Sequence, residues 1–189
     1  MKALEAFISK IHPLDEETLH RFTHSWHPVE FSRGEVVTYA GEIEHYFYFL
    51  LEGIQKACYE KNGKEHVIAF TLPPAFTCIP ESFITRRPSH YFLQCITSCK
   101  VLRISHTQME AMADASHDIE RLIRKSHENM LAGLVTRYHQ LIACTMQERF
   151  KLFMSRSAHL LNLIPHKDIA SYLGMDATNF SKLFHSVKI

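Results

Sequence analysis

The sequence predicts an α+β fold: an antiparallel double-stranded β-roll with flanking helices, a long dimerisation helix and a small all-α helix-turn-helix domain. Three observations predict it. Residues 27–105 divide into short runs rich in β-branched and aromatic side chains, separated by Gly and Pro. Residues 117–145 repeat apolar side chains at helical spacing, and residues 164–187 fit two short helices joined by a tight turn.

The predicted roll depends on seven strand-like runs. Asn62-Gly63 between two of them predicts a hairpin turn, because both residues tolerate the positive φ of a type I′ turn. Seven or eight antiparallel strands in about 80 residues imply a sandwich or a roll. Residues 1–25 are expected to form a helix, and Ser105 is expected to cap another. The runs are VEFS, EVVTYA, YFYFLL, IQKACYE, EHVIAFTL, YFLQCIT and CKVLRIS.

Composition narrows the class of protein. Of the 189 residues, 46% are apolar and 22% are charged, which is enough for one large domain and a small one. The longest uninterrupted apolar run, residues 46–51, is far below the roughly 18 residues that a membrane span needs. No export signal begins the chain, so we expect a cytoplasmic protein. The five cysteines form no C-x-x-C motif, which favours reduced, buried thiols.

The helix predicted over residues 117–145 would be about 43 Å long, at about 1.5 Å per residue. One small domain cannot cover that length. Its apolar stripe is wider than a single seam, so we expect one face on the roll and another on the same helix of a second subunit. Close approach of two helices would offset the cost of Gly133; two shorter helices in a monomer are the alternative. The expected dimer contacts are Ile123, Met130, Leu134, Tyr138 and Leu141.

Residues 164–187 carry the signature of a helix-turn-helix. Pro165 suits the first turn of a helix, Gly174 suits a left-handed cap, and Asp176 can cap a second helix at once. Ala170 is small where the second helix would cross the first. Ala, then Gly four residues later, then apolar anchors fit the motif in register. The apolar residues expected in its core are Ile169, Leu173, Met175, Phe180 and Leu183.

The order of these parts resembles one known family. GEVVTYAGE and YFLLEG in the roll, the long helix and KDIASYLGMDATNFSKL together resemble the Crp/Fnr transcriptional regulators. In that family the roll holds an effector, the long helix makes the dimer, and the second helix of the motif enters the major groove. The resemblance therefore implies double-stranded DNA, a second copy of the chain and RNA polymerase as partners, no membrane, and a cyclic nucleotide or another small effector as ligand.

The resemblance also assigns DNA-binding residues. By position, Ala177, Thr178 and Lys182 fall where the family reads base edges, and Ser181 falls where it faces phosphate. The family often has Arg and Glu at the first two positions. A methyl or hydroxyl cannot make the bidentate guanine contact of Arg, so we expect a different operator. The sequence stops at Ile189, so we expect no β-wing after the recognition helix.

The effector site departs from the family pattern. A cyclic nucleotide needs its phosphate charge balanced, which a Gly-Glu pair and a following Arg do in the family. The matching stretch is IPESFITRRPSHYFLQ, where Pro80 replaces Gly and the Arg position falls on Ser89. We therefore expect weak or no cyclic-AMP binding, unless a shifted register brings Arg86 or Arg87 into place. The candidate effector-binding residues are Glu81, Ser82, Arg86, Arg87 and Ser89.

Two other interpretations stay open. One is a cupin-like metal-binding enzyme, since His20, His24 and His27 would share a helix face. The sequence provides no obvious acidic or cysteine ligand to complete such a site, and His66 lacks the second His of a cupin H-x-H, so we expect no metal site and no catalytic residues. The other is an AraC-like regulator, which NFSKLFHSV resembles; such proteins carry two helix-turn-helix units, and this sequence shows one.

Charge changes along the chain with the predicted organisation. Residues 1–113 carry a net charge of −2 and residues 114–189 a net charge of +3. Six Lys and Arg against two Asp give residues 149–189 a net charge of +4, a modest indication of a polyanionic partner. The predicted domains are a cyclic-nucleotide-binding-like roll (1–113), the dimerisation helix (114–145) and the DNA-binding helix-turn-helix (146–189).

Overall fold

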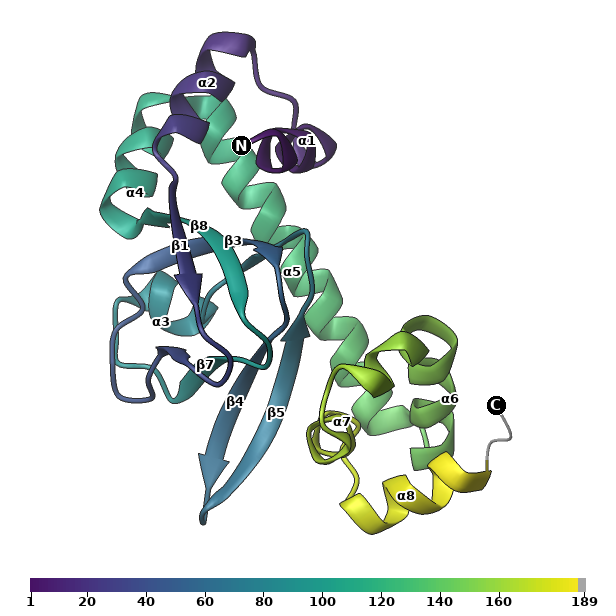
Figure 1. The fold of residues 1–189 in the computed structure, drawn as a ribbon. Helices are drawn as coiled ribbons and strands as arrows, with labels where there is room; N and C mark the ends of the chain where they lie inside the picture. Colours follow the sequence, from purple (N-terminus) through teal and green to yellow (C-terminus); the bar gives the residue numbers. More distant parts are fainter. Residues whose placement is uncertain (187–189) are drawn as a thin grey trace.

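The computed structural model describes residues 1–186 and has the α+β fold that the sequence predicts (Figure 1). Two antiparallel sheets form a roll, and one long helix runs from the end that carries α1 and α2 to a small helical domain at the other end. The helices are α1 (Lys2–Ile11), α2 (Glu16–His24), α3 (Pro80–Thr85), α4 (His106–Ala115), α5 (His117–Ala143), α6 (Met146–Ser157), the 3₁₀ helix η1 (Ala158–Asn162), α7 (His166–Tyr172) and α8 (Ala177–Ser186).

The roll has four strands in each sheet, in the orders β1-β8-β3-β6 and β2-β7-β4-β5. All pairs are antiparallel, and all seven predicted runs become strands. The eighth strand, β6, is not among the predicted runs. The strands are β1 (His27–Phe31), β2 (Val36–Thr38), β3 (Tyr46–Glu52), β4 (Gln55–Lys61), β5 (Lys64–Thr71), β6 (Ala75–Thr77), β7 (Tyr91–Cys95) and β8 (Cys99–Ser105).

The hairpin between β4 and β5 turns where the sequence predicts. Asn62 and Gly63 have φ values of 54° and 71°, and Lys61 pairs with Lys64 across the two-residue turn. The hairpin extends from the roll toward the small domain (Figure 1). This extension brings β5 beside α7.

The N-terminal segment forms two helices, so the single helix expected over residues 1–25 is wrong. Pro13 lies in the break, and Asp15 caps the second helix by accepting a hydrogen bond from the Thr18 N–H at 3.0 Å. The turn lets both helices bury side chains in the core of the roll. That core combines Leu4 and Ile8 of α1, Phe22 of α2, Trp26, Phe47, Phe49, Leu102, Ile104, and Ile119 and Leu122 of α5.

The long helix is continuous over 27 residues, which confirms its predicted extent within two residues and excludes two shorter helices. Ser105 caps α4 through a reciprocal capping box with Gln108, as predicted, and Ser116 caps α5. The first turns of α5 bury Ile119 and Leu122 against the roll. Its second half leaves the roll, and most of its apolar side chains are exposed.

The small domain has its own core, which also reaches the roll. Phe150 and Phe153 of α6 and Leu160 of η1 pack on the two helices of the predicted motif. Ile54 and Ile96 of the roll belong to the same buried cluster. The small domain is therefore packed against the roll as well as linked to it. Residues 187–189, the end of the predicted 146–189 domain, and the expected absence of a β-wing lie outside the described residues.

The sequence analysis expected reduced, buried cysteines and no membrane-spanning segment. All five cysteines are free thiols, and Cys58, Cys78, Cys95 and Cys99 are buried. No helix within residues 1–186 is both long enough and apolar enough to cross a membrane.

Candidate nucleic-acid and effector sites

The turn of the helix-turn-helix is built as its glycine predicts. Gly174 has a φ of +67°, its N–H donates to the Ser171 carbonyl at 3.0 Å, and the Met175 N–H donates to the Ala170 carbonyl at 3.0 Å. This is the Schellman arrangement, which satisfies the last carbonyls of a helix. A Cβ at Gly174 would also lie 3.2 Å from Leu141 of α5. Pro165 lies at the N-cap of α7, one residue before the first turn where it was expected.

The second helix of the motif starts immediately after the turn. The Asp176 carboxylate accepts a hydrogen bond from the Asn179 N–H at 2.7 Å, which lowers the pKa of this carboxyl. The predicted core residues lie inside: Ile169, Leu173, Met175 and Phe180 are buried, and Leu183 packs on them half-buried. The fold of the motif therefore follows its local sequence closely.

The predicted DNA-binding residues lie on one exposed part of α8. Ala177, Thr178, Ser181 and Lys182 are all exposed, within the first two turns of the helix. The side chains of Thr178, Ser181 and Lys182 make no hydrogen bond to any other residue of 1–186. They are available to an external partner. Lys167, at the start of α7, adds an exposed positive charge that the position-by-position comparison did not assign.

The roll encloses a cavity of about 390 Å³ that opens toward α5. Its lining is mostly apolar, and Glu81 is the only charged residue among the lining side chains. One carboxylate oxygen of Glu81, Oε2, is buried and has no hydrogen-bond partner among the described residues. The lining residues are Ala57, Ile68, Ala69, Thr71, Phe76, Thr77, Cys78, Ile79, Pro80, Glu81, Tyr91, Leu93, Met130 and Leu134.

The two serines among the candidate effector residues bond elsewhere. The Ser82 hydroxyl accepts from the Glu44 N–H at 2.9 Å and donates to the Arg87 carbonyl at 2.6 Å. The Ser89 hydroxyl donates to the Tyr91 carbonyl at 2.8 Å and accepts from the Tyr91 N–H at 2.9 Å. Both side chains fix the loop around them, and neither lines the cavity.

The two candidate arginines also lie outside the cavity lining. Arg86 follows α3 with a φ of 57°, and its guanidinium donates to the Glu44 carbonyl and lies 3.3 Å from the His45 ring nitrogen. Arg87 is exposed on the loop. Of the five candidate effector residues, Glu81 alone lines the cavity. The cavity therefore contains a carboxylate and no guanidinium.

A buried carboxyl group, which the sequence analysis did not single out, fixes the segment before α3 that lines this cavity. Glu44 accepts hydrogen bonds from the Thr38 hydroxyl at 2.6 Å, the Tyr46 N–H at 3.2 Å and the Ile79 N–H at 3.4 Å. Burial raises the pKa of Glu44, against the opposing effect of the Thr38 hydrogen bond. Ile79 precedes α3, so Glu44 fixes the helix that carries Glu81. Nothing in the local sequence distinguishes Glu44 from other acidic residues.

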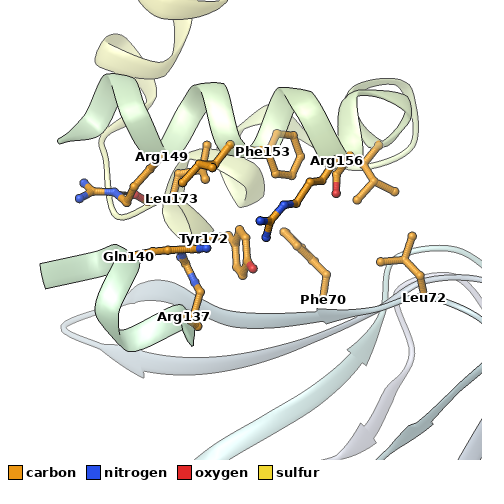
Figure 2. A pocket seen from close by; sticks show the side chains of 12 residues that line it. Phe70, Leu72, Arg137, Gln140, Arg149, Phe153, Arg156, Tyr172 and Leu173 are labelled. Atoms are coloured by element: carbon orange, nitrogen blue, oxygen red, sulfur yellow. Dashed lines mark hydrogen bonds between the residues drawn. The ribbon is translucent and has the colours of Figure 1, made fainter. Parts of the chain in front are cut away.

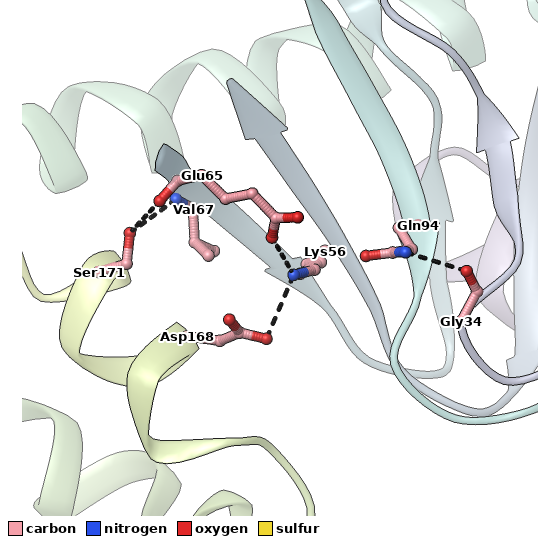
Figure 3. A network of polar contacts seen from close by, with 7 residues as sticks. All are labelled: Gly34, Lys56, Glu65, Val67, Gln94, Asp168 and Ser171. Atoms are coloured by element: carbon pink, nitrogen blue, oxygen red, sulfur yellow. Dashed lines mark hydrogen bonds and ion pairs between the residues drawn. The ribbon is translucent and has the colours of Figure 1, made fainter. Parts of the chain in front are cut away.

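An ion-pair network joins the small domain to the roll (Figure 3). Lys56 of β4 lies 2.7 Å from Glu65 of β5 and 3.3 Å from Asp168 of α7. Lys56 and Asp168 are both buried. The Ser171 hydroxyl of α7 also accepts from the Val67 N–H at 2.9 Å. These contacts hold the first helix of the motif on the β4-β5 hairpin.

The predicted dimer contacts divide between two environments. Ile123 packs against the core of the roll, and Met130 is half-buried at the cavity. Leu134, Tyr138 and Leu141 are exposed. Four further apolar residues join them on the exposed half of α5 and its end: Leu131, Val135, Ile142 and Met146, of which Ile142 is 66% exposed.

The histidines considered as metal ligands make other contacts. The His20 and His24 rings stack at 3.7 Å on α2, and His24 hydrogen-bonds the His20 carbonyl. His27 begins β1 and so does not continue that helix face. Within residues 1–186 no three or more His, Cys, Asp or Glu side chains are grouped as metal ligands.

Comparison with known proteins finds one matching family model and several solved structures with a similar fold. The family model of the cyclic nucleotide-binding domain matches residues 28–116. No curated protein sequence matches the chain. Similar solved structures include FixK2 of Bradyrhizobium japonicum, with a TM-score of 0.74 and 16% identity over 85% of this chain and 83% of that one.

Two further solved structures have a similar fold. The c-di-GMP responsive global regulator CLP of Xanthomonas campestris gives a TM-score of 0.68 and 17% identity over 91% of each chain. A CooA mutant from Carboxydothermus hydrogenoformans gives 0.70 and 14% identity over 93% of this chain and 86% of that one. Residues 28–116 thus match the family model of the cyclic nucleotide-binding domain, and the chain as a whole has the same fold as these three structures.

Proposed function

We propose that this chain is a cytoplasmic, homodimeric, DNA-binding transcriptional regulator of the Crp/Fnr type, whose roll senses an effector other than cyclic AMP. The observation that carries the proposal is the helix-turn-helix with its Schellman turn. Its second helix exposes Ala177, Thr178, Ser181 and Lys182, which we call the recognition face. A helix presented in this way fits the major groove of DNA. RNA polymerase is a further partner of such a regulator where it activates a promoter.

The recognition face offers three short side chains and one lysine for contacts with the edges of DNA bases. Lys182 can contact a guanine edge or a phosphate, and the Thr178 hydroxyl can bond to any base. The Ala177 and Thr178 methyl groups suit a thymine methyl. An operator rich in such contacts, without the guanine that an Arg would select at these positions, follows from this chemistry.

The exposed half of α5 supports the dimer. A row of apolar side chains on a helix that has left the roll needs a partner surface to exclude water. A second α5 offers the same row and is self-complementary about a two-fold axis. Gly133 lies on this exposed half, with open space around the position of its missing Cβ. The resulting pair would set the distance between two recognition helices.

The roll cavity supports an effector without a phosphate group. Its apolar lining gives an anion no counter-charge, and the buried Glu81 oxygen would repel one. A ligand with apolar surface and one hydrogen-bond donor or positive charge aimed at Glu81 fits this lining. Met130 and Leu134 of α5 complete the wall, so such a ligand would contact the dimer helix directly. Differential contact with α5 is the means by which it could shift the regulator between two states.

Selection of bound sequences from a random DNA pool by the purified protein tests the proposal. We expect a pseudo-palindrome with half-site centres about 34 Å apart. Lys182→Ala should weaken binding by about 1 to 3 kcal/mol if Lys182 reads a base. Lys10→Ala, which removes an exposed lysine of α1, is the matched control and should leave binding unchanged. Failure to enrich any sequence, with Lys182→Ala and wild type alike, would contradict DNA recognition by α8.

A further inference from the structure

Two of the five cysteines lie at the two ends of one turn in the roll. Cys95 ends β7, Cys99 begins β8, and residues 96–98 form the turn between them. Both side chains are only 1% exposed, and both belong to one buried cluster of the roll. The turn itself therefore holds two thiols near each other.

Contacts with the start of β4 locate both sulfurs. Gln55, the first residue of β4, donates from its Nε2 to the Cys95 sulfur at 3.7 Å. The Cys99 thiol lies 3.6 Å from the Ile54 carbonyl oxygen, one residue earlier, and 3.3 Å from the Thr97 carbonyl oxygen in the turn. The two sulfurs thus lie over neighbouring residues of one strand, which places them beside each other.

Gly53 lets the turn between β3 and β4 approach the Cys99 sulfur. It has a φ of +97°, and a Cβ at this position would lie 2.6 Å from the sulfur, closer than packed atoms come. Residue 53 therefore has no side chain to cover the thiol. A molecule as small as hydrogen peroxide reaches Cys99 through local opening of this turn.

The pair differs in ionisation from two other buried cysteines. Burial raises the pKa of Cys58 to about 12 and raises that of Cys78 as well, which keeps both thiols protonated and unreactive. A hydrogen bond between Cys95 and Cys99 raises the pKa of Cys95 and lowers that of Cys99 in spite of burial. The thiolate is the form that attacks an oxidant, so Cys99 is the nucleophile and Cys95 is the thiol beside it.

We propose that Cys95 and Cys99 form a site of reversible oxidation, where hydrogen peroxide converts the two thiols into an intrachain disulfide. The Cys99 thiolate attacks one peroxide oxygen, the O–O bond breaks, and hydroxide leaves as Cys99 becomes a sulfenic acid. The Cys95 sulfur then attacks the Cys99 sulfur, and the hydroxyl group leaves as water with the Cys95 proton. Two electrons pass from the sulfur pair to hydrogen peroxide, which is reduced to hydroxide and water.

The turn between the two cysteines contacts the small domain. It carries Ile96, which is buried in the same cluster as Phe153 of α6. Phe70 and Leu72 of the roll pack against this cluster too, and Figure 2 shows them facing α6 at the junction. The disulfide removes the Cys99 hydrogen and draws the ends of the turn together, so oxidation alters the contact that holds α6 on the roll.

Tryptic mapping of the full chain after treatment with hydrogen peroxide tests the site. The peptide of residues 87–100 contains both cysteines and no other, because Pro88 protects the bond after Arg87 from trypsin. After oxidation and alkylation in denaturant, this peptide should have lost two hydrogen atoms and carry no alkyl group. The peptide of residues 57–61, which contains Cys58 alone, is the matched control and should be alkylated. Dithiothreitol should restore both thiols.

Hydrogen exchange tests the contact with α6. Exchange in residues 146–157 should be several-fold faster in the oxidised wild type than in the reduced one, because the packing of Ile96 is altered. Peroxide should leave this exchange unchanged in Cys99→Ala. Cys144→Ala keeps the pair and is the matched control, which should respond to peroxide as wild type does.

The mapping needs no variant, so the site stays testable even if Cys99→Ala fails to fold. Alkylation of both Cys95 and Cys99 after peroxide would overturn the site. Addition of oxygen to the peptide of residues 87–100, in place of the loss of hydrogen, would overturn it as well. Equal exchange in α6 before and after oxidation would overturn the coupling to the small domain. These outcomes are independent of DNA binding by α8.

Discussion

Two buried ionisable residues fix the positions of helices in this protein. Glu44 fixes the start of α3, and Lys56 fixes α7 on the hairpin. Each is polar and buried, and each is paired with groups from other elements. Such residues carry larger energetic consequences than the more numerous exposed ion pairs, because removal of one partner leaves a desolvated group unpaired.

Glu44 predicts a pH dependence of stability. Its folded pKa is raised by burial, so the native state holds this proton more tightly than the unfolded chain does. Its contribution to the free energy of unfolding is then complete below the unfolded pKa of 4.5 and is lost as the pH rises through the raised value. Glu44→Gln stays neutral and lacks this loss.

The measurement is urea unfolding of wild type and Glu44→Gln between pH 4.5 and pH 7.5. The difference in unfolding free energy, wild type minus variant, should fall as the pH rises through the raised pKa of Glu44. Constant loss of a hydrogen bond in the variant changes the offset between the curves and not their slopes. Parallel curves over this range would show that Glu44 titrates normally.

Lys56 predicts a large loss of stability on truncation. Burial acts to lower the pKa of Lys56, but the hydrogen bond to Glu65 and the charge of Asp168 raise it above its ordinary value. Lys56→Met leaves Asp168 buried without its cation and should cost about 3 to 5 kcal/mol. Thermal and urea unfolding measure this cost. Lys100→Met breaks the exposed pair with Glu52 and should have little effect; equal losses in the two variants would contradict the network.

At the scale of elements, α5 has two halves with different partners. Its first half contributes Ile119 and Leu122 to the core of the roll. Its second half exposes an apolar row in the single chain. The five residues expected as dimer contacts are thus divided, with Ile123 packed on the roll and Tyr138 exposed.

Leu134→Lys tests the second half of α5. Leu134 is exposed in the single chain, so the substitution should leave the protomer folded. In a dimer the new charge would be buried without a partner, which should split it. Sedimentation should give about twice the 22.0 kDa chain mass for wild type and the chain mass for the variant. Tyr39→Lys, at an exposed aromatic residue of the roll, should remain dimeric; a monomeric wild type at micromolar concentration would contradict the dimer.

At the scale of the whole molecule, the roll, α5 and the small domain form one packed unit. Ile54 and Ile96 of the roll share a core with the small domain, and the effector cavity uses α5 as a wall. A ligand in this cavity therefore contacts the helix that leads to the DNA-binding motif. This arrangement makes the chemistry of the effector cavity decisive for regulation.

Cyclic AMP should bind weakly or not at all. The cavity has no guanidinium to pair with the phosphate, and loss of such a contact costs on the order of 2 to 5 kcal/mol, or roughly 30-fold to several thousand-fold in affinity. Calorimetry of the full chain with cyclic AMP measures this. Micromolar binding that disappears in Arg86→Ala or Arg87→Ala would show that the loop rearranges to supply the charge.

The sequence by itself determined the features that short-range physics controls. Asn62-Gly63, Ser105 and Gly174 each set a turn or a cap through their own backbone freedom or side-chain oxygen, and the structure has each of them. Apolar periodicity determined the extent of α5, because helical spacing of apolar residues is also a local property of the sequence. Pro13 was also a local signal, and it marks the break between α1 and α2 that the expectation of one N-terminal helix overlooked.

Only the tertiary structure decided which distant side chains meet. Lys56 and Asp168 are 112 positions apart, and Gln55 and Cys95 are 40 positions apart. The exclusion of Arg86 from the effector cavity depends on the left-handed backbone after α3 and on the Glu44 carbonyl that accepts from it. Such placements depend on how whole elements pack, and packing is set by the sum of many weak contacts that no local pattern records.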